Sequence, residues 1–360
     1  MSPRYLILLT TLLLTACGPT DEGLALQADY LQRLNNAVEG DGAAAFRREQ
    51  LLAYRMPPRR ERLIDIPEIR IGLLDLLIGV RRCPALQQQI SLRNSSLGKQ
   101  LQPSNRLAYE GDLLRALEDC RNALVRSPDP ALSATLAELA EEKRRQLPAV
   151  FWNALNASGE VERYLRFADQ ALPTSAQEDD AALDALAQLA AIGNGLPQRL
   201  PPPVAQLDPL LFALHSSVQG GQLITSLSSL THTLIQASQL LEGRQQRRPA
   251  CPQGKPTPRG RILQNIFVKF YAGGLQPYLA QVHQRGERWS LHLRQLSEAP
   301  QAPAATRTYL LSLGGAEASL WEMFQQANRR HVRAWQQTLK RCGLAPGQAG
   351  WEGQAASSDQ

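Results

Sequence analysis

The sequence predicts an all-α protein, a multi-helix bundle with two disulfide-stapled helical halves. Apolar residues recur at steps of three and four along most of the chain, which is the spacing of one helix face. Strict alternation, the pattern typical of strands, is rare, and its one notable instance is Trp289, Leu291 and Leu293. With 43% hydrophobic and 20% charged residues, the chain has enough apolar material for a core and is not a disordered tail.

The first sixteen residues have the features of a secretory signal peptide. Tyr5–Leu14 form an apolar stretch behind a single positive charge, and this stretch is too short to span a bilayer. The four residues 14–17 resemble the lipobox of bacterial lipoproteins, in which the cysteine thiol, here Cys17, is acylated with fatty acids such as palmitate. Gly18 follows, and by resemblance to lipoprotein sorting in Gram-negative bacteria this favours the outer membrane, with the protein facing the periplasm.

We expect residues 17–21 to be a tether and residues 22–193 to form an N-terminal helical half. The clearest apolar stripes of this half lie in 22–38, 104–125 and 131–155. Residues 194–204 contain Pro197 and three consecutive prolines, so they cannot be helical throughout and are predicted to be a linker.

A C-terminal helical half is expected over 205–344. Residues 209–241 contain no Asp, Glu, Lys or Arg, which predicts a helix packed on several sides or the wall of an apolar pocket. A long loop is expected over 243–260, where four prolines lie, and a further helical stripe over 305–340. The tail, 345–360, is rich in Gly, Ala, Gln and Ser and is predicted to be disordered.

Four cysteines remain once Cys17 is assigned to lipid, an even number in an oxidising compartment. Three pairings are open. Order along the chain favours Cys83 with Cys120 and Cys251 with Cys342, at separations of 37 and 91 residues. A metal site is the competing interpretation, but no CxxC or HxxxH spacing supports it, so we expect neither a metal nor a cofactor.

Residues 64–110 carry the densest pattern. Pro67 is well placed at a first helical position, and the residues after it are apolar on two faces, which predicts a buried helix. Two acids on that helix, Glu68 and Asp75, must then be hydrogen-bonded or paired, because an uncompensated buried charge is costly. The expected buried polar network consists of Glu68, Arg70, Asp75, Arg93, Asn94, Arg106 and Glu110.

Two interpretations of these acids stay open. In the functional interpretation, the acids act as a general acid and base or form half of a metal site. In the structural interpretation, they form ion pairs with Arg70, Arg93 or Arg106. We favour the structural interpretation, since buried networks also perturb carboxylates. Residues 94–99 lack the first glycine and the hydroxyl residue after lysine that a phosphate-binding loop needs, so a turn between helices explains them better.

The segments IPEIRIGLLDLL, RNSSLGK and PSNRLAYE, together with the lipobox and the later FVKFY and LQPYL, resemble the bacterial lipoprotein family catalogued as domain of unknown function 3080. The resemblance covers most of the mature chain. It implies a secreted, lipid-anchored protein of Gram-negative bacteria. It brings no activity, substrate or catalytic residue to transfer.

No residue is assigned a catalytic role. The five histidines are scattered, no GxSxG motif is present, and the expected disulfides leave no free thiol. The net charge is +6, with basic clusters over 47–62 and 244–259. The expected compartment excludes nucleic acid, and it favours anionic lipid headgroups or an acidic cell-wall polymer, although a solvated basic face explains the clusters equally well.

The function expected from the sequence is therefore that of a non-catalytic envelope protein. Its partners would be outer-membrane lipid through acylated Cys17, and an envelope protein or an anionic cell-wall polymer. Two alternatives are a cell-envelope hydrolase using the carboxylates between Glu68 and Glu110, and a carrier of an apolar ligand beside residues 209–241.

Overall fold

The computed structural model describes residues 21–69, 72–96, 98–125, 129–175 and 180–351. The predicted signal peptide and Cys17 lie outside the described residues, as do Arg70 and residues 352–360. The described residues form helices joined by loops, with no strand among them, which confirms the all-α prediction. None of the described helices is long and apolar enough to cross a membrane.

Eight α-helices, α1 to α8, are described in the N-terminal part of the chain. They are α1 (Glu22–Val38), α2 (Arg59–Arg62), α3 (Leu73–Gly79), α4 (Pro84–Asn94), α5 (Pro103–Leu124), α6 (Pro130–Ala157), α7 (Gly159–Leu165) and α8 (Ala181–Gly195). Three short 3₁₀ helices lie between them, over Arg48–Tyr54, Val80–Arg82 and Gly98–Gln100.

The second half contains the longest helix of the described chain. Its elements are α9 (Val204–Ser216), α10 (Gln219–Arg247), α11 (Pro258–Ile266), a π-helix (Phe267–Leu275), α12 (Gln276–Ser297), α13 (Ala304–Gly314) and α14 (Leu320–Arg341).

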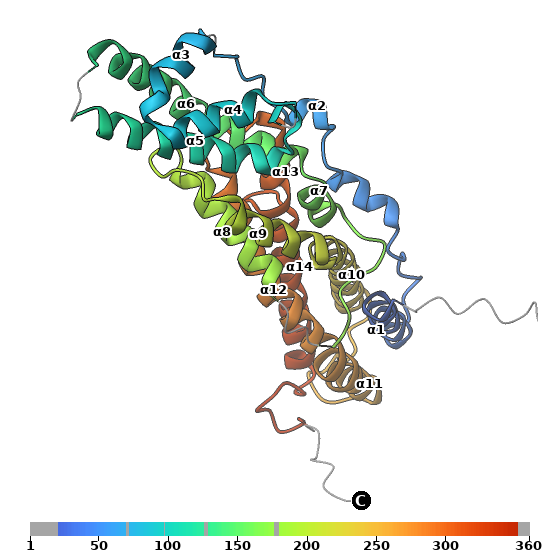
Figure 1. Ribbon diagram of the computed structural model, residues 1–360. Coiled ribbons are helices and arrows are strands. Elements are labelled where there is room, and N and C mark those ends of the chain that lie inside the picture. Colours follow the sequence, from blue (N-terminus) through green and yellow to red (C-terminus); the bar gives the residue numbers. More distant parts are fainter. Residues whose placement is uncertain (1–20, 70–71, 97, 126–128, 176–179, 352–360) are drawn as a thin grey trace, which may run out of the picture.

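The molecule is elongated (Figure 1). Helices α3, α4, α5 and α6 lie together at one end, α1, α10 and α11 lie toward the other, and α8, α9, α12 and α14 lie between them. Helix α5 packs along α6, and α10 packs along α14, α1 and α12. One continuous apolar core follows from this packing, with Leu114, Leu227, Trp289 and Phe324 among its buried side chains.

The stretch 209–241, expected as one helix, is divided between α9 and α10, and α10 is buried on several sides as the first interpretation expected. Leu223, Leu227, Leu230 and Leu234 are each almost fully buried. Its hydroxyls are tolerated there because several donate to a carbonyl one turn back, as Ser238 does to Leu234 O at 2.6 Å.

Both predicted disulfides are present. Cys83–Cys120 joins the start of α4 to α5, and Cys251–Cys342 joins the loop after α10 to the end of α14. That loop is shorter than the expected 243–260. Helix α10 continues to Arg247, and α11 begins at Pro258, with the Thr257 hydroxyl accepting from Gly260 N at 3.0 Å.

The prediction of a buried helix starting at Pro67 is wrong. The chain is extended at Leu63 and forms no helix over 63–69, and helix α3 begins only at Leu73. The side chain of Asn153 on α6 accepts from Ile64 N at 2.8 Å and donates to Ile64 O at 2.7 Å, while Gln146 donates to Pro67 O at 3.0 Å. These contacts hold the segment along α6, and they leave Glu68 exposed.

The proposed division into two halves stays a prediction. Residues 201–203 are extended, and α8 and α9 on either side of the proline-rich stretch pack against each other. In the predicted disordered tail, residues 345–351 are described. Arg261 donates to Gly350 O at 2.7 Å, and the rings of Trp351 and Phe267 lie 6.2 Å apart.

Candidate functional site

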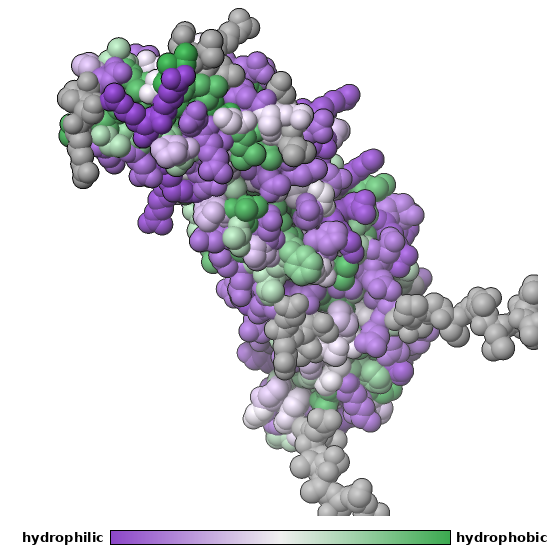
Figure 2. All heavy atoms as spheres, viewed as in Figure 1, coloured by the Kyte–Doolittle hydropathy of each residue, from purple (hydrophilic) through white to green (hydrophobic). Residues whose placement is uncertain are grey.

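A cleft of about 610 Å³ lies at the end of the molecule formed by α3, α4, α5 and α6. Its charged lining residues are Arg93, Arg106, Lys143 and Glu68. Apolar walls come from the segment 63–69, α3, α4, α5 and α6, through Ile66, Ile69, Leu76, Ile90, Leu113 and Leu139. Figure 2 shows the same mixture, with hydrophobic and hydrophilic surface side by side at this end.

The end of α4 and the turn after it position one side of the cleft. Arg93 donates to Gly98 O at 2.7 Å, and Asn94 donates to Ile90 O at 2.8 Å. The Ser95 hydroxyl donates to Leu92 O at 2.7 Å and accepts from Gly98 N at 3.0 Å. A Cβ at Gly98 would lie only 1.9 Å from Leu92 O, so the turn requires glycine. These bonds support the interpretation of residues 94–99 as a turn between helices.

The floor of the cleft holds a buried ion pair. Glu110 on α5 is 2% exposed, and Lys143 Nζ on α6 lies 3.0 Å from its carboxylate. Arg106 Nε lies 4.0 Å from the same carboxylate, and its side chain makes no hydrogen bond within the described part of the chain. Arg106 Nε is therefore buried without a hydrogen-bond partner among the described residues, whereas Lys143 is hydrogen-bonded to Glu110.

Tyr109 lines the cleft beside this pair. Burial raises the pKa of its phenol well above the ordinary value, so the hydroxyl stays protonated at neutral pH. The hydroxyl donates to Gln89 O at 3.2 Å and links α5 to α4.

The structure brings together much of the predicted polar network. Glu68, Arg93, Asn94 and Arg106 line one cleft, and Glu110 lies directly beneath it. Glu68 is exposed rather than buried, because its segment is not helical. Asp75 belongs to α3, but its side chain, like the whole of Arg70, lies outside what the structure describes. The assignment of a role to these residues stays a prediction.

Lys143 is the partner that the sequence did not reveal. It lies 33 residues from Glu110, on the antiparallel neighbour of α5. The signal that could have found it is the α5–α6 hairpin itself, whose short connection places these two helix faces opposite each other.

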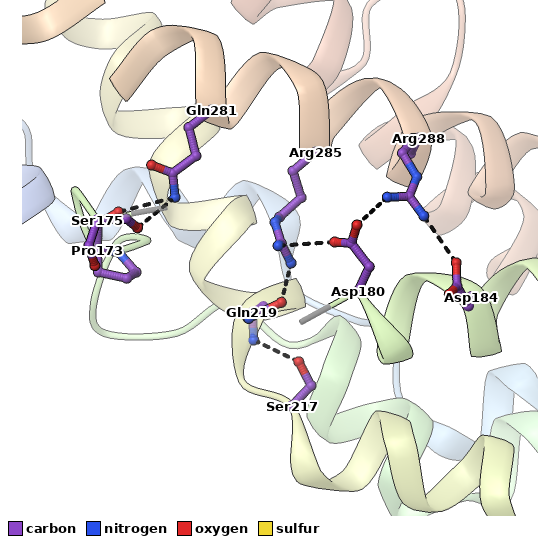
Figure 3. Close-up of polar contacts among 9 residues, drawn as sticks. All are labelled: Pro173, Ser175, Asp180, Asp184, Ser217, Gln219, Gln281, Arg285 and Arg288. Atoms are coloured by element: carbon purple, nitrogen blue, oxygen red, sulfur yellow. Dashed lines mark hydrogen bonds and ion pairs between the residues drawn. The ribbon is translucent and has the colours of Figure 1, made fainter. Parts of the chain in front are cut away.

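A second polar cluster, which sequence reasoning missed, ties α8, α10 and α12 together (Figure 3). Asp180 contacts both Arg285, at 3.1 Å, and Arg288, and Arg288 lies 3.0 Å from Asp184. Arg285 also bonds to Gln219 of α10. The two arginines are three residues apart and the two aspartates four residues apart. Such spacings place like charges on one helix face, which is the signal that could have indicated the cluster.

His331 lies in a third polar cluster that is closed to solvent. Its Nε2 is 2.7 Å from the Tyr30 hydroxyl, and Trp335 Nε1 donates to that hydroxyl at 2.9 Å. Burial lowers the pKa of His331 to about 3, so the ring is neutral at physiological pH. With 0% exposure, this histidine holds α1 against α14 and does not face a substrate.

The described residues contain no group of three or more His, Cys, Asp or Glu that could hold a metal ion. The cavity beside α10 that Thr231, His232 and Leu320 line measures about 190 Å³, with both polar and apolar walls. A cavity of that size is small for the apolar ligand of a carrier.

The fold and the cleft define an all-α, disulfide-stapled protein with a mixed apolar and cationic cleft at one end. Residues 27–346 match the family described as protein of unknown function DUF3080, and the chain belongs to this family. Neither the curated proteins nor the solved structures contain a match to the chain.

Proposed function

We propose that this protein is a non-catalytic envelope lipoprotein that binds an anionic polymer of the cell wall in the cleft between α4, α5 and α6. The observation that carries the proposal is the charge of the cleft. Among the described side chains, three cations, Arg93, Arg106 and Lys143, stand against two acids, Glu68 at the rim and Glu110 beneath, so these side chains carry a net positive charge.

Arginine is well suited to such a partner. Its planar guanidinium presents a fork of donors that matches a carboxylate, and the apolar walls of the cleft supply contact area around that bond. Arg93 and Arg106 come from consecutive helices, α4 and α5, whose relative position is fixed by the Cys83–Cys120 disulfide.

The place of the cleft in the molecule supports a wall partner over a lipid one. A lipid on Cys17 would attach the protein five residues before α1. Helix α1 lies away from the end that carries the cleft (Figure 1). The cleft would then project from the bilayer toward the wall.

Co-sedimentation of the mature protein with isolated peptidoglycan sacculi tests the proposal. The double variant Arg93→Gln, Arg106→Gln should bind at least about tenfold more weakly, the cost of one or two charge-assisted bonds. The matched control, Arg121→Gln with Arg333→Gln, removes the same charge from exposed positions outside the cleft and should bind as the parent does. Equal binding of parent and cleft variant would reject the proposal.

One observation favours a second function, that of a cell-envelope hydrolase. The cleft is polar and holds an exposed carboxylate, Glu68, which could act as a general base. Release of soluble fragments from sacculi separates the two functions. A hydrolase releases soluble fragments, and its Glu68→Gln variant should still bind sacculi but release none. A binding protein releases none.

A further inference from the structure

Four arginines line a second cavity, of about 300 Å³, next to α2 and α7. They are Arg55, Arg59, Arg62 and Arg166, and the only acid of the lining is Glu162. None of these residues lines the cleft described above, so what this cavity binds is independent of the proposed function.

Arg62 forms the rigid back wall of this cavity. Its side chain is 5% exposed and is held by three bonds. Nε donates to Pro57 O at 2.9 Å, Nη1 to Asn156 O at 3.0 Å, and Nη2 to Glu162 Oε2 at 2.8 Å. The charge of Glu162 is therefore already balanced by Arg62.

The other three arginines are not neutralised by a carboxylate in the described part of the chain. These three, Arg55, Arg59 and Arg166, are exposed. The other predicted basic cluster differs, because Glu39 pairs with both Arg244 and Arg259, and Asp41 pairs with Arg247. In the described part of the chain, Arg55 and Arg59 of the first cluster thus line a cavity together with Arg166, and no carboxylate pairs with any of the three.

The backbone that carries these arginines is fixed. Arg55 and Arg59 flank Pro57 and Pro58, whose rings restrict the backbone, and Arg62 holds the Pro57 carbonyl. Arg166 caps the end of α7, where its N–H donates to Glu162 O at 3.0 Å. Guanidinium groups on rigid supports lose less entropy when they bind an anion.

We propose that this cavity, the arginine pocket, binds a dianionic phosphate group. Three unpaired guanidiniums match a phosphate monoester, which carries a charge of about −2 and three acceptor oxygens, better than a carboxylate with one charge and two oxygens. Met56 and Phe167 line the same pocket and supply an apolar surface for the organic part of a phosphate ester. Phosphate also relieves the repulsion among the three cations.

Calorimetric titration of the mature protein in nonionic detergent tests the inference, with inorganic phosphate as the probe and acetate at equal ionic strength as the reference. Phosphate should bind at least tenfold more tightly than acetate. The triple variant Arg55→Gln, Arg59→Gln, Arg166→Gln should lose this binding, and its helix content by circular dichroism should match that of the parent.

A matched triple variant controls for net charge. Arg47→Gln, Arg48→Gln and Arg60→Gln remove three exposed arginines from the same part of the sequence that do not line the pocket. They should leave phosphate binding unchanged. An equal loss in both triple variants, or phosphate binding no tighter than acetate binding, would overturn the inference.

The phosphate could belong to a soluble ester or to a lipid headgroup, and a second titrant separates these sources. Dihexanoyl phosphatidic acid should bind at least tenfold more tightly than inorganic phosphate if the pocket accepts a lipid headgroup. Equal or weaker binding assigns the pocket to a soluble phosphate ester.

Discussion

Lys143 and Glu110 show how one buried pair fixes the end of the molecule that carries the cleft. The carboxylate is 2% exposed, and the pair joins α5 to α6 at 3.0 Å. Each partner would be costly to bury alone, because a charge without its counter-ion loses its hydration without compensation.

We predict that Lys143→Met lowers the free energy of unfolding by about 3 kcal/mol, because it leaves Glu110 buried beside the more distant Arg106. Urea denaturation measures the loss. Lys143→Arg retains a cation and should recover most of the stability. A urea denaturation curve of Lys143→Met that coincides with that of the parent would show that the pair does not stabilise the fold.

His331 gives the protein a pH dependence of known sign. Its pKa is lowered to about 3 by burial, whereas in the unfolded chain it is near 6.5. Between these values the unfolded state binds the proton and the folded state does not, so stability falls as the pH is lowered through this range.

We therefore expect the parent to lose about 3 kcal/mol more than His331→Gln when the pH is lowered from 7.5 to 4.5, since two units below pH 6.5 contribute about 1.4 kcal/mol each. Urea unfolding of both proteins at the two pH values gives the difference. The partly exposed His283, replaced by Gln, serves as the matched control for a histidine-to-glutamine substitution. The same pH dependence in His331→Gln would contradict a buried neutral histidine.

At the scale of the element, local periodicity predicted several helices closely, whereas it missed a break within one stripe and the conformation of residues 63–69. Helix α1 coincides with the predicted stripe 22–38, and α5 and α6 differ from theirs by one or two residues, because local periodicity determines such helices. The stripe over 305–340 is broken by residues 315–319 into α13 and α14. Residues 63–69 form no helix because Asn153, far along the chain, binds Ile64, and local sequence carries no sign of that contact.

The disulfide at the end of α14 makes a glycine of α11 indispensable. A Cβ at Gly260 would lie 2.7 Å from Cys251 Sγ and 3.3 Å from Cys342 Sγ. Replacement of glycine by alanine inside a helix normally stabilises it by up to about 1 kcal/mol. At this position the clash with the disulfide should reverse the sign.

We predict that Gly260→Ala lowers the melting temperature, whereas Gly243→Ala on α10, where the nearest atom lies 3.6 Å away, raises it slightly. In the background Cys251→Ala, Cys342→Ala both sulfur contacts are absent, and the remaining neighbour, Leu344 Cδ1 at 3.2 Å, is the end of a flexible side chain that can shift. In that background Gly260→Ala should become neutral or stabilising. Thermal melts of the parent, Gly260→Ala, the double cysteine variant and the variant that combines all three substitutions form a double-mutant cycle. A destabilisation that persists without the disulfide would refute the packing argument.

At the scale of the whole molecule, the sequence indicated four of the residues that line the cleft, but neither Lys143 nor the shape of the cleft. Glu68, Arg93, Asn94 and Arg106 were expected to form one buried network, and they line one open cleft. Its openness depends on the segment 63–69 and on the α5–α6 pairing, both of which are long-range. The arginine pocket likewise needs Arg166, which lies more than a hundred residues from Arg62 in the sequence and next to it in the fold.

The proposed lipid anchor rests on one thiol, that of Cys17. We predict that Cys17→Ser abolishes incorporation of a radiolabelled fatty acid, because this cysteine is the only acyl acceptor of the lipobox. The variant should also leave the outer-membrane fraction on density-gradient separation. Label retained by the variant would refute the lipoprotein assignment.

The central claim, that the cleft meets an anionic wall polymer, is tested most directly by photo-crosslinking in living cells. A benzophenone amino acid at Asn94, on the exposed rim of the cleft, should give a high-mass adduct that collapses on digestion with muramidase. The same probe at Gln206, on the exposed face of α9, should give none. A muramidase-resistant adduct of discrete mass at Asn94, or equal yields at the two positions, would contradict the account.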